Sequence, residues 1–554
     1  MDLLGRTMTC SDEALLFPAC HLRWLDFRRS IRVFCLACPI NLLEPIHEIV
    51  KIRMECMMKG LLLLSIFSLS IAVVACSGGE SGSNNGSSPS AASTERIVYL
   101  ADQDIDEVFE LYLAGSSIKL NPSLSPGKNV LDFQITPDKT AVVYRADQDT
   151  NDVFELYRVE FANPGVSTKL NSPLPVGGDV WSAVITPDSS SVVYVADQTT
   201  DGVSELYRVP FATPGVSSKL NSPLVPGGNV FFDIRVTPDN SAVVYRATQA
   251  TANIIELYHV PFATPGQSTK LNGTLPPNAD VEPFFKIAPN STLVAYTVLR
   301  IPINPPGGFD LLSELHSVTF AIPGQSTKLN IPSPGAVLGN LTSVGEYEIT
   351  PDSSAVIYTL TNSIDLRLLY RVPFATPGQS TKLSDRFIDR FAIRPDSSGV
   401  VYGSPKIISN QDQAELYLVP FATPGVSTKL NGPLVAGGSI QSDFDRAFRI
   451  APDNSSVVYV ADETTNNVIE IYRVPFSTPG VSTKLNGPLV AGGGVQLFDT
   501  FSITPDSSSV LYIADQTTNG AFELYRVPFA TPGVSTKLNG PLTSGGDVTR
   551  HIVQ

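Results

Sequence analysis

The stretch Ile185-Thr-Pro-Asp-Ser-Ser-Ser-Val-Val-Tyr-Val-Ala-Asp197, followed by Glu205-Leu-Tyr-Arg-Val-Pro-Phe211 and Ser218-Lys-Leu-Asn221, decides the fold of this chain. Versions of this block occur nine times after position 95, with a period of about 50 residues. Each copy carries one tyrosine in its most apolar run: Tyr99, Tyr144, Tyr194, Tyr245, Tyr296, Tyr358, Tyr402, Tyr459 and Tyr512. Such self-similarity indicates a repeat architecture, which outweighs the expectation that 554 residues form several domains.

Each copy predicts four antiparallel strands. The first ends in Ile-Thr-Pro-Asp, and the second, Val192–Ala196, is apolar throughout, as expected of a strand covered on both faces. The third, Glu205–Phe211, alternates in polarity and ends near a proline, whereas Ser218–Asn221 is short and polar, as suits an outer edge. The Thr-Pro-Asp-Ser segment supplies turn chemistry between the first two strands. Four-stranded units repeated radially are typical of a β-propeller.

The two ends of the repeat region complement each other. The first copy opens at Arg96-Ile-Val-Tyr-Leu-Ala101, which is a second strand without a first strand before it. The last copy closes with Asp547-Val-Thr-Arg-His-Ile-Val553, which is a first strand with nothing after it. We therefore predict an all-β fold over residues 95–554: one closed propeller of about nine four-stranded blades. Eight blades is the alternative, and both chain ends contribute to the closing blade.

Composition excludes some classes of function. The chain is 43% apolar and 16% charged, which fits a loop-rich globular protein and is too apolar for disorder. Its formal net charge of −15 argues against nucleic acid as a partner. All six cysteines lie early, at Cys10, Cys20, Cys35, Cys38, Cys56 and Cys76. The repeats therefore contain no disulfide and no thiolate metal site.

Residues 58–75 have the pattern of a secretory signal peptide. Lys59 precedes an apolar run, Gly60–Ala75, that is too short to be a membrane-spanning helix. Val73-Val-Ala-Cys76 resembles the bacterial lipobox, although Val73 stands where leucine is usual. That resemblance implies acylation of Cys76 and membrane attachment, and the alternative is an ordinary signal peptide. Ser77, rather than aspartate, after the cysteine implies an outer-membrane destination by analogy with enterobacterial lipoproteins.

The segments on either side of the signal have separate interpretations. Residues 76–94 combine the lipidated cysteine with a Gly/Ser/Asn-rich tether, a composition that behaves as flexible coil. Residues 1–57 show no clear period, and a signal peptide works only at an N-terminus. We interpret this stretch as lying upstream of the true start, at Met57 or Met58. A genuine extension is the alternative.

The repeat also resembles a known family. Pro187-Asp-Ser-Ser-Ser-Val-Val-Tyr-Val-Ala-Asp197 with Glu205-Leu-Tyr-Arg-Val209 looks like the TolB-like, WD40-like "PD" repeat of bacterial periplasmic propellers. The resemblance covers roughly residues 95–554 and implies a propeller fold in the cell envelope. The glycine usual after Pro-Asp is replaced, and Asn290 replaces the aspartate in one copy. The separate N-terminal domain of TolB is absent, so a Tol–Pal role is not implied.

Candidate ligand-binding residues come from the first strand of each copy. Two residues before its final Ile or Val, nearly all copies have a large apolar side chain, such as Phe133 or Phe285, which marks the packed face. The alternate positions vary and are mostly polar. If this strand is innermost, they line the central channel: Asp132, Asp233, Arg235, Lys286, Glu346, Glu348, Arg390, Arg449 and His551. They form either a specific pocket or a water-filled channel that needs only solubility.

Two other features of the sequence are candidates for function: the acidic loops and the irregular copies. The loops after the second strand are acidic, with Asp102, Asp147, Asp197, Asp462 and Asp515 at their start. Such oxygen ligands suit calcium, but the spacing of the helix–loop–helix calcium motif is not met, so we favour solvated turns. Two copies are irregular, at Arg300–Leu312 and at Ser384–Asp389, which indicates either function or drift.

The sequence does not predict a catalytic centre. His259, His316 and His551 occupy three different repeat registers, and no zinc-protease, phosphate-loop or nucleophile-elbow motif is present. We therefore expect a lipid-anchored envelope propeller that binds or scaffolds an unknown protein or glycan, without cofactor or metal. Two alternatives remain open: a glycan lyase or hydrolase that uses the channel charges, and a calcium-stabilised surface adhesin.

Overall fold

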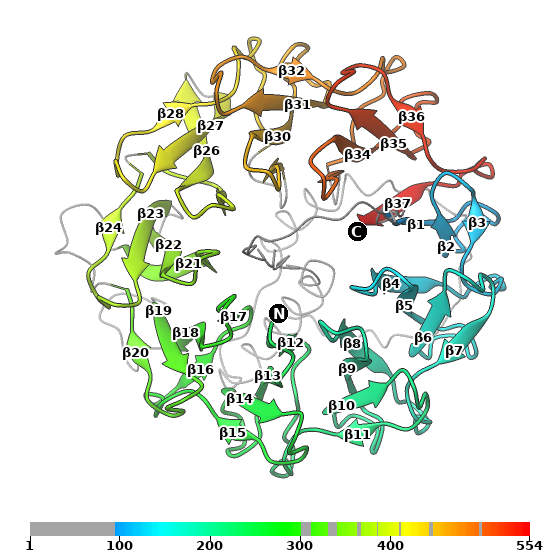
Figure 1. Cartoon of the computed structure of the whole chain (residues 1–554), viewed down its shortest axis with the longest axis vertical. Helices are drawn as coiled ribbons and strands as arrows, with labels where there is room; N and C mark the ends of the chain where they lie inside the picture. The colour runs from blue at the N-terminus through cyan, green and yellow to red at the C-terminus, as the bar shows by residue number, and fades with distance from the viewer. Residues whose placement is uncertain are drawn as a thin grey trace, which may run out of the picture. The chain divides into compact units, whose positions relative to one another are not determined.

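The computed structural model is a ring of nine β-sheets (Figure 1). It describes residues 95–300, 312–330, 341–362, 367–384, 386–408, 411–441, 447–497 and 501–554. These residues belong to the second of two units of the chain, Gly79–Gln554. Every element within them is a strand. The prediction of an all-β propeller with nine blades is confirmed, and eight is excluded.

The strands of each blade are given from the innermost to the outermost. Blade 1 contains β37 (Val548–Val553), β1 (Ile97–Ala101), β2 (Glu110–Leu113) and β3 (Ile118–Lys119). Blade 2 contains β4 (Val130–Ile135), β5 (Ala141–Ala146), β6 (Glu155–Glu160) and β7 (Ser167–Lys169). Blade 3 contains β8 (Val180–Ile185), β9 (Ser191–Ala196), β10 (Glu205–Pro210) and β11 (Ser218–Lys219).

Blade 4 contains β12 (Arg235–Val236), β13 (Ala242–Ala247), β14 (Glu256–Pro261) and β15 (Thr269–Lys270). Blade 5 has its innermost strand in two pieces, β16 (Ala279–Val281) and β17 (Lys286–Ile287), followed by β18 (Leu293–Arg300), β19 (Leu312–Thr319) and β20 (Thr327–Lys328). Blade 6 contains β21 (Leu341–Ile349), β22 (Ala355–Asn362), β23 (Arg367–Pro373) and β24 (Thr381–Lys382).

Blade 7 contains β25 (Phe391–Ile393), β26 (Gly399–Ile408), β27 (Gln411–Pro420) and β28 (Thr428–Lys429). Blade 8 contains β29 (Phe448–Ile450), β30 (Ser456–Ala461), β31 (Glu470–Pro475) and β32 (Thr483–Lys484). Blade 9 contains β33 (Phe501–Ile503), β34 (Ser509–Ala514), β35 (Glu523–Pro528) and β36 (Thr536–Lys537).

Burial follows strand position within the blade. The apolar second strand is covered on both faces, so all six residues of β9 are buried. The outermost strand is only two residues long in most blades, and both residues of β11 are exposed. Because so short an edge presents few unpaired backbone groups, it protects the rim from pairing with other chains.

The core of the molecule lies between blades rather than within them. Each of the nine buried apolar clusters among the described residues combines two neighbouring blades. One cluster joins Leu511 and Ile513 of blade 9 to Tyr99 and Val548 of blade 1. Burial of apolar surface at every interface therefore holds the ring together without interruption.

The chain ends close the ring as the sequence predicts. Strand β37 pairs with β1 in antiparallel register, from Ile97 opposite Val553 to Ala101 opposite Val548. Arg96 and Gln554 exchange two backbone hydrogen bonds of 3.0 and 2.9 Å. Arg526 of blade 9 adds an ion pair of 2.6 Å with Glu95. Blade 1 is therefore built from both ends of the repeat region, and no sheet interface is left open.

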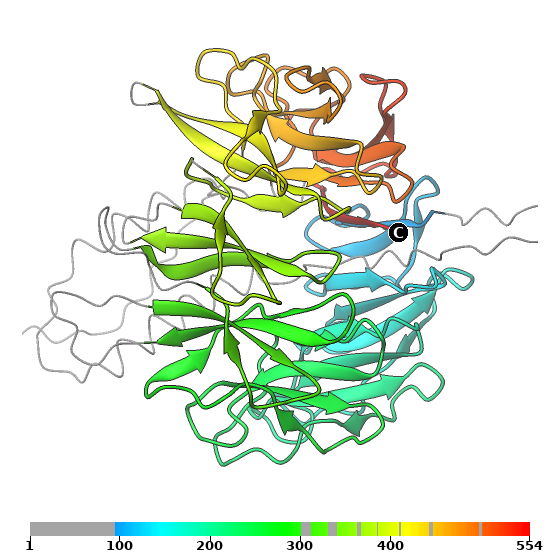
Figure 2. The same cartoon turned by 60° about the vertical axis from the view of Figure 1, so that its left-hand side comes forward.

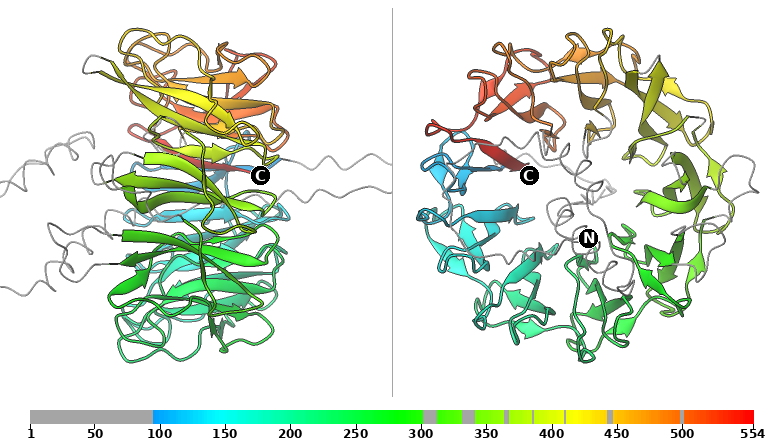
Figure 3. Two further views of the ribbon diagram at one scale, coloured as in Figure 1. Left: turned by 90° about the vertical axis from the view of Figure 1, so that its left-hand side faces the viewer. Right: turned by 180° about the vertical axis from the view of Figure 1, so that it is seen from behind.

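Blades 5–7 differ from the rest in strand length. Their second and third strands run for seven to ten residues, whereas the equivalent strands of blades 2–4, 8 and 9 have six. The long hairpins reach beyond their neighbours on one face of the ring (Figures 2 and 3). We refer to blades 5–7 as the irregular sector. It includes both irregular copies noted in the sequence.

Candidate functional site

The innermost strands place the candidate channel residues at the interfaces between blades. In β4, Phe133 lies opposite Tyr144 and packs against residues of blade 1, so the large apolar position faces the preceding blade. The alternate positions contact the following blade, as Arg235 does where its guanidinium lies 5.9 Å from the ring of Phe285. The innermost strands surround the centre of the ring (Figure 1).

Asp132 and Asp233 form ion pairs that connect blades. Asp132 contacts Arg145 of β5, and this arginine also donates to the carbonyl of Val180 in blade 3 at 3.0 Å. Asp233 contacts Arg246 of β13 at 2.7 Å, and Arg246 donates to the carbonyl of Val281 in blade 5 at 2.8 Å. Charges buried in this way are satisfied by each other and by backbone oxygens. Each aspartate therefore positions an arginine that fastens one blade to the next.

Sequence reasoning missed the two arginines, although a signal for them exists. Arg145 and Arg246 each follow the second-strand tyrosine, where the other seven copies have a different residue. They occur in the same two copies that carry Asp132 and Asp233. A comparison of the nine copies shows that the arginine occurs where the aspartate occurs, and this would have predicted both ion pairs.

Four candidate residues form a chain of charges through the irregular sector. Lys286 of blade 5 pairs with Glu348 of blade 6, and Glu346 of blade 6 lies 3.8 Å from Arg390 of blade 7. The side chains of Glu346, Glu348 and Arg390 remain about a quarter to a third exposed, at 26%, 36% and 35%. Because they are both paired and accessible to solvent, these charges are the part of the inner rim best placed to contact a ligand.

Arg449 and His551 complete the candidate set. The guanidinium of Arg449 in blade 8 lies 5.8 Å from the ring of Phe501 in blade 9, which repeats the Arg235 contact. The structure does not place His551 among the channel-lining positions to which the sequence assigned it. It lies opposite Tyr99, in the packed register of Phe133, is 7% exposed, and its Nε2 is 2.7 Å from Ser502 Oγ. Arg550 takes the alternate position instead, with its guanidinium 5.7 Å from the ring of Phe133.

The physical reason for this correction is the register in which the closing strand pairs. Pairing of β1 with β37 shifts between Leu100 and Ala101, as pairing of β4 with β5 shifts between Val130 and Asp132. The last strand ends in two apolar residues, Ile552 and Val553, and sequence alone matched the wrong one to Ile135 of blade 2. The register set by the backbone pairing moves every assignment in β37 by one residue.

The acidic loops are buried at their first aspartate rather than solvated. Asp197 is 2% exposed, and its two carboxylate oxygens accept backbone N–H groups of Asp179 and Gly202 at 2.5 and 3.2 Å. Equivalent pairs of bonds form at Asp102, Asp147, Asp462 and Asp515. These carboxylates clamp the loop that enters a blade to the loop after its second strand.

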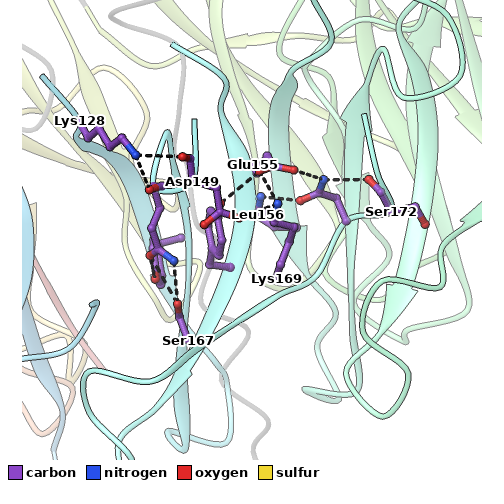
Figure 4. A network of polar contacts seen from close by, with 11 residues as sticks. Lys128, Asp149, Glu155, Leu156, Ser167, Lys169 and Ser172 are labelled. Atoms are coloured by element: carbon purple, nitrogen blue, oxygen red, sulfur yellow. Dashed lines mark hydrogen bonds and ion pairs between the residues drawn. The ribbon is translucent and has the colours of Figure 1, made fainter. Parts of the chain in front are cut away.

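A second repeated contact was not anticipated. In eight blades, the third-strand glutamate two residues before the Tyr or His pairs with the lysine of the fourth strand at 2.6–2.9 Å. Figure 4 shows the contact in blade 2, where Lys169 reaches both Glu155 at 2.6 Å and Asp149 at 2.7 Å. Leu368 replaces this glutamate in blade 6. The contact anchors the short outer strand to the sheet.

Two hollows lie on the outer part of the blades. One, of about 610 Å³, lies between the loops that leave blade 2 and includes Val153, Leu174 and Pro175. The other, of about 320 Å³, lies in blade 5 beside Tyr296, Glu314 and His316. The second occurs where the repeat itself changes, and it belongs to the irregular sector.

Several predictions concern features that the described residues do not test. Cys76, the signal segment 58–75, residues 1–57 and the tether lie outside them. Within the described residues, no group of three or more His, Cys, Asp or Glu side chains is arranged to hold a metal ion. No helix in the same part of the chain has the length and apolar character needed to span a membrane.

Comparisons with known proteins give only distant structural likenesses. No protein-family model matches the chain, and no functionally curated protein matches it. A solved eukaryotic initiation factor is similar with a TM-score of 0.49 and 9% identity, over 83% of this chain and 98% of its own. An oligogalacturonate lyase in complex with manganese is similar with a TM-score of 0.37 and 14% identity, over 68% of this chain and 97% of its own. The strand pairing of the chain itself establishes that it is a nine-bladed β-propeller.

Proposed function

We propose that this chain is a lipid-anchored β-propeller of the bacterial cell envelope that binds a protein or glycan partner and performs no catalysis of its own. The signal pattern, Cys76 and the Gly/Ser tether support the anchor. The Pro-Asp repeat supports membership of the TolB-like propellers, and with it an envelope location. In this proposal, a rigid ring is attached to the membrane through a flexible segment and presents its binding surface there.

The irregular sector is the observation that carries the binding role. Blades 2–4, 8 and 9 all have six residues in their second and third strands, whereas blades 5–7 extend these hairpins on one face. The same blades hold the partly exposed charges Lys286, Glu348, Glu346 and Arg390 at their inner rim. Because variable loops on a fixed scaffold commonly carry recognition, we assign the partner to this sector.

Photocrosslinking in intact cells tests this assignment. A photoreactive amino acid replaces Phe387, which is 39% exposed in blade 7, or Val534, which is 65% exposed on the rim of blade 9. We expect a discrete crosslinked product from position 387 that is absent from position 534. Mass spectrometry of that product identifies the partner. Equal capture at the two positions, or no capture at 387 across growth conditions, would contradict the proposal.

A further inference from the structure

In blades 1–4 and 9, a glutamine side chain fills the space beside the second-strand tyrosine, and we call it the plug. In blade 3, Tyr194 donates its hydroxyl hydrogen to Gln198 Oε1 at 2.6 Å, and Gln198 Nε2 donates to Ser217 Oγ at 2.9 Å. Blades 2 and 9 repeat both bonds with Gln148 and Gln516. The carboxamide therefore satisfies a tyrosine hydroxyl with its oxygen and a serine hydroxyl with its nitrogen.

Blade 5 has lost this plug. Strand β18 continues through Arg300 while paired with β19, and Arg300 is exposed at the position where blades 1–4 and 9 have glutamine. Tyr296 and Ser326 contact each other directly at 2.5 Å. A Cβ atom added at Gly487 of blade 8 would meet Gln516 Nε2 at 3.0 Å, whereas at the equivalent Gly273 the nearest atoms belong to Gly324 and Ser326, at 3.2 and 3.3 Å. The space that the carboxamide fills elsewhere is open here.

A second substitution enlarges the same space. His316 replaces the tyrosine of the third strand, and its ring stacks on Tyr296 with centroids 5.8 Å apart. In blade 3 the tyrosine at this position, Tyr207, donates to its neighbouring glutamate at 3.0 Å. The shorter imidazole leaves its Nε2 at 3.5 Å from Glu314 Oε2. Together the changes produce the hollow of about 320 Å³, at the lower end of the range of small-ligand sites.

The hollow exposes polar groups that the other blades cover. The side chain of Glu314 is 31% exposed, against at most 9% for the equivalent glutamates of the other seven blades that have one. Burial alone would raise the pKa of Glu314, but the hydrogen bond and charge of Lys328 outweigh burial and lower that pKa, so the group is ionised at neutral pH. Burial lowers the pKa of His316, which favours the neutral imidazole. The site therefore offers a carboxylate and a neutral ring, beside the apolar side chains of Leu275 and Val298.

We propose that this hollow binds an N-acetylated amino sugar, with the acetamido group in the place of the missing glutamine carboxamide. The acetamido oxygen accepts from Tyr296, its N–H donates to Ser326, and its methyl group contacts Leu275 and Val298. The sugar hydroxyls donate to Glu314 and exchange a hydrogen bond with His316. A glutamine side chain from a partner peptide would form hydrogen bonds with Tyr296 and Ser326 but would leave Glu314 and His316 without a ligand group. For this reason we favour the sugar. The proposal concerns the ligand of one blade and does not depend on the membrane anchor.

The test is a titration of the full chain by calorimetry and by ligand-observed saturation-transfer NMR. The probes are N-acetylglucosamine, glucose as the sugar without an amide, propionamide as the amide without a ring, and a glutamine dipeptide. We expect N-acetylglucosamine to bind on the order of tenfold more tightly than each of the others, because it alone fills both halves of the site. Absence of N-acetylglucosamine binding, or tighter binding of the dipeptide, would overturn the proposal.

Two variants and a control locate the site. His316→Tyr restores the residue of the other blades and fills the hollow, and Ser326→Ala removes the acceptor for the acetamido N–H. Each substitution should weaken binding of N-acetylglucosamine on the order of tenfold. The melting temperature of the His316→Tyr variant should not fall below that of the wild type. His259→Arg restores the repeat in blade 4, away from the hollow, and should leave binding unchanged. Unchanged binding in both His316→Tyr and Ser326→Ala would refute the site, while leaving the crosslinking result on the irregular sector unaffected.

Discussion

Asp197 illustrates how single side chains position the loops of this molecule. It directly follows β9, is almost completely buried, and accepts the backbone N–H groups of two separate loops. An exposed turn was the expectation from sequence, because Asp-Gln-Thr-Thr-Asp201 is polar throughout. The sequence does not reveal that the loop from the preceding blade passes beside it, and only that approach makes the carboxylate an internal acceptor.

Replacing Asp197 by alanine should destabilise the propeller. The change leaves two backbone N–H groups without their acceptor, at a cost of about 2–4 kcal/mol in the free energy of unfolding. Urea denaturation followed by circular dichroism measures this loss. Asp201→Ala, at the exposed end of the same loop, is the control and should lie close to wild type. An Asp197→Ala variant as stable as the control would show that water replaces the carboxylate at no cost.

At the scale of elements, the strand that completes a blade need not be near it in sequence. Strand β37 pairs with β1 across more than 440 residues, and the hydrogen bond of Asp547 N–H to Asp102 repeats the clamp of the other blades. The complementary fragments at the two ends made this predictable. The hairpin of β26 and β27, with ten residues in each strand, was not predicted, although its copy lacks the Ala-Asp-Gln sequence found at the end of the second strand in blades 1–3 and 9. Sequence marked the neighbouring irregular segments but gave no lengths for the paired strands.

Removal of β37 should open the ring. Deleting residues 548–554 exposes the edge of β1 and removes Val548 from the cluster between blades 9 and 1. We expect a lower melting temperature and loss of hydrogen-exchange protection at β1 before other blades, because pairing and burial are lost at the same interface. Ile552→Val, which preserves the strand, serves as the control. Uniform protection in the deletion variant would mean that closure contributes little.

At the scale of the whole molecule, similar interfaces between blades repeat around the ring, and the blades that differ most from the others lie next to one another in the irregular sector. Inter-blade cation–π contacts recur around it, as between Arg208 and Phe262 at 4.2 Å and between Arg473 and Phe529 at 4.3 Å. Repetition of this kind gives a stable frame, in which three adjacent blades vary without loss of the fold. The proposed tether would let that frame move as one body above a membrane.

The anchor is tested at the same scale. In a bacterial host, the chain that starts at Met57 should fractionate with membranes, and Cys76→Ser should move it to the soluble fraction, because the acyl chains attach through that sulfur. Ser81→Ala, in the tether that follows the cysteine, should remain with the membranes. Membrane retention of the Cys76→Ser protein after a carbonate wash would rule out lipidation as the means of attachment.

The sequence by itself determined the nine-fold repeat, the four strands of each copy and the closure of the ring. These follow from local rules, since polarity alternates along a strand and turns depend on a few adjacent residues. The tertiary structure alone decided that Lys286 meets Glu348, that His551 is packed, and that blade 5 contains a hollow. Each of these depends on which side chain the neighbouring strand or blade presents, and residues some 60 positions apart are brought together only when the ring is assembled.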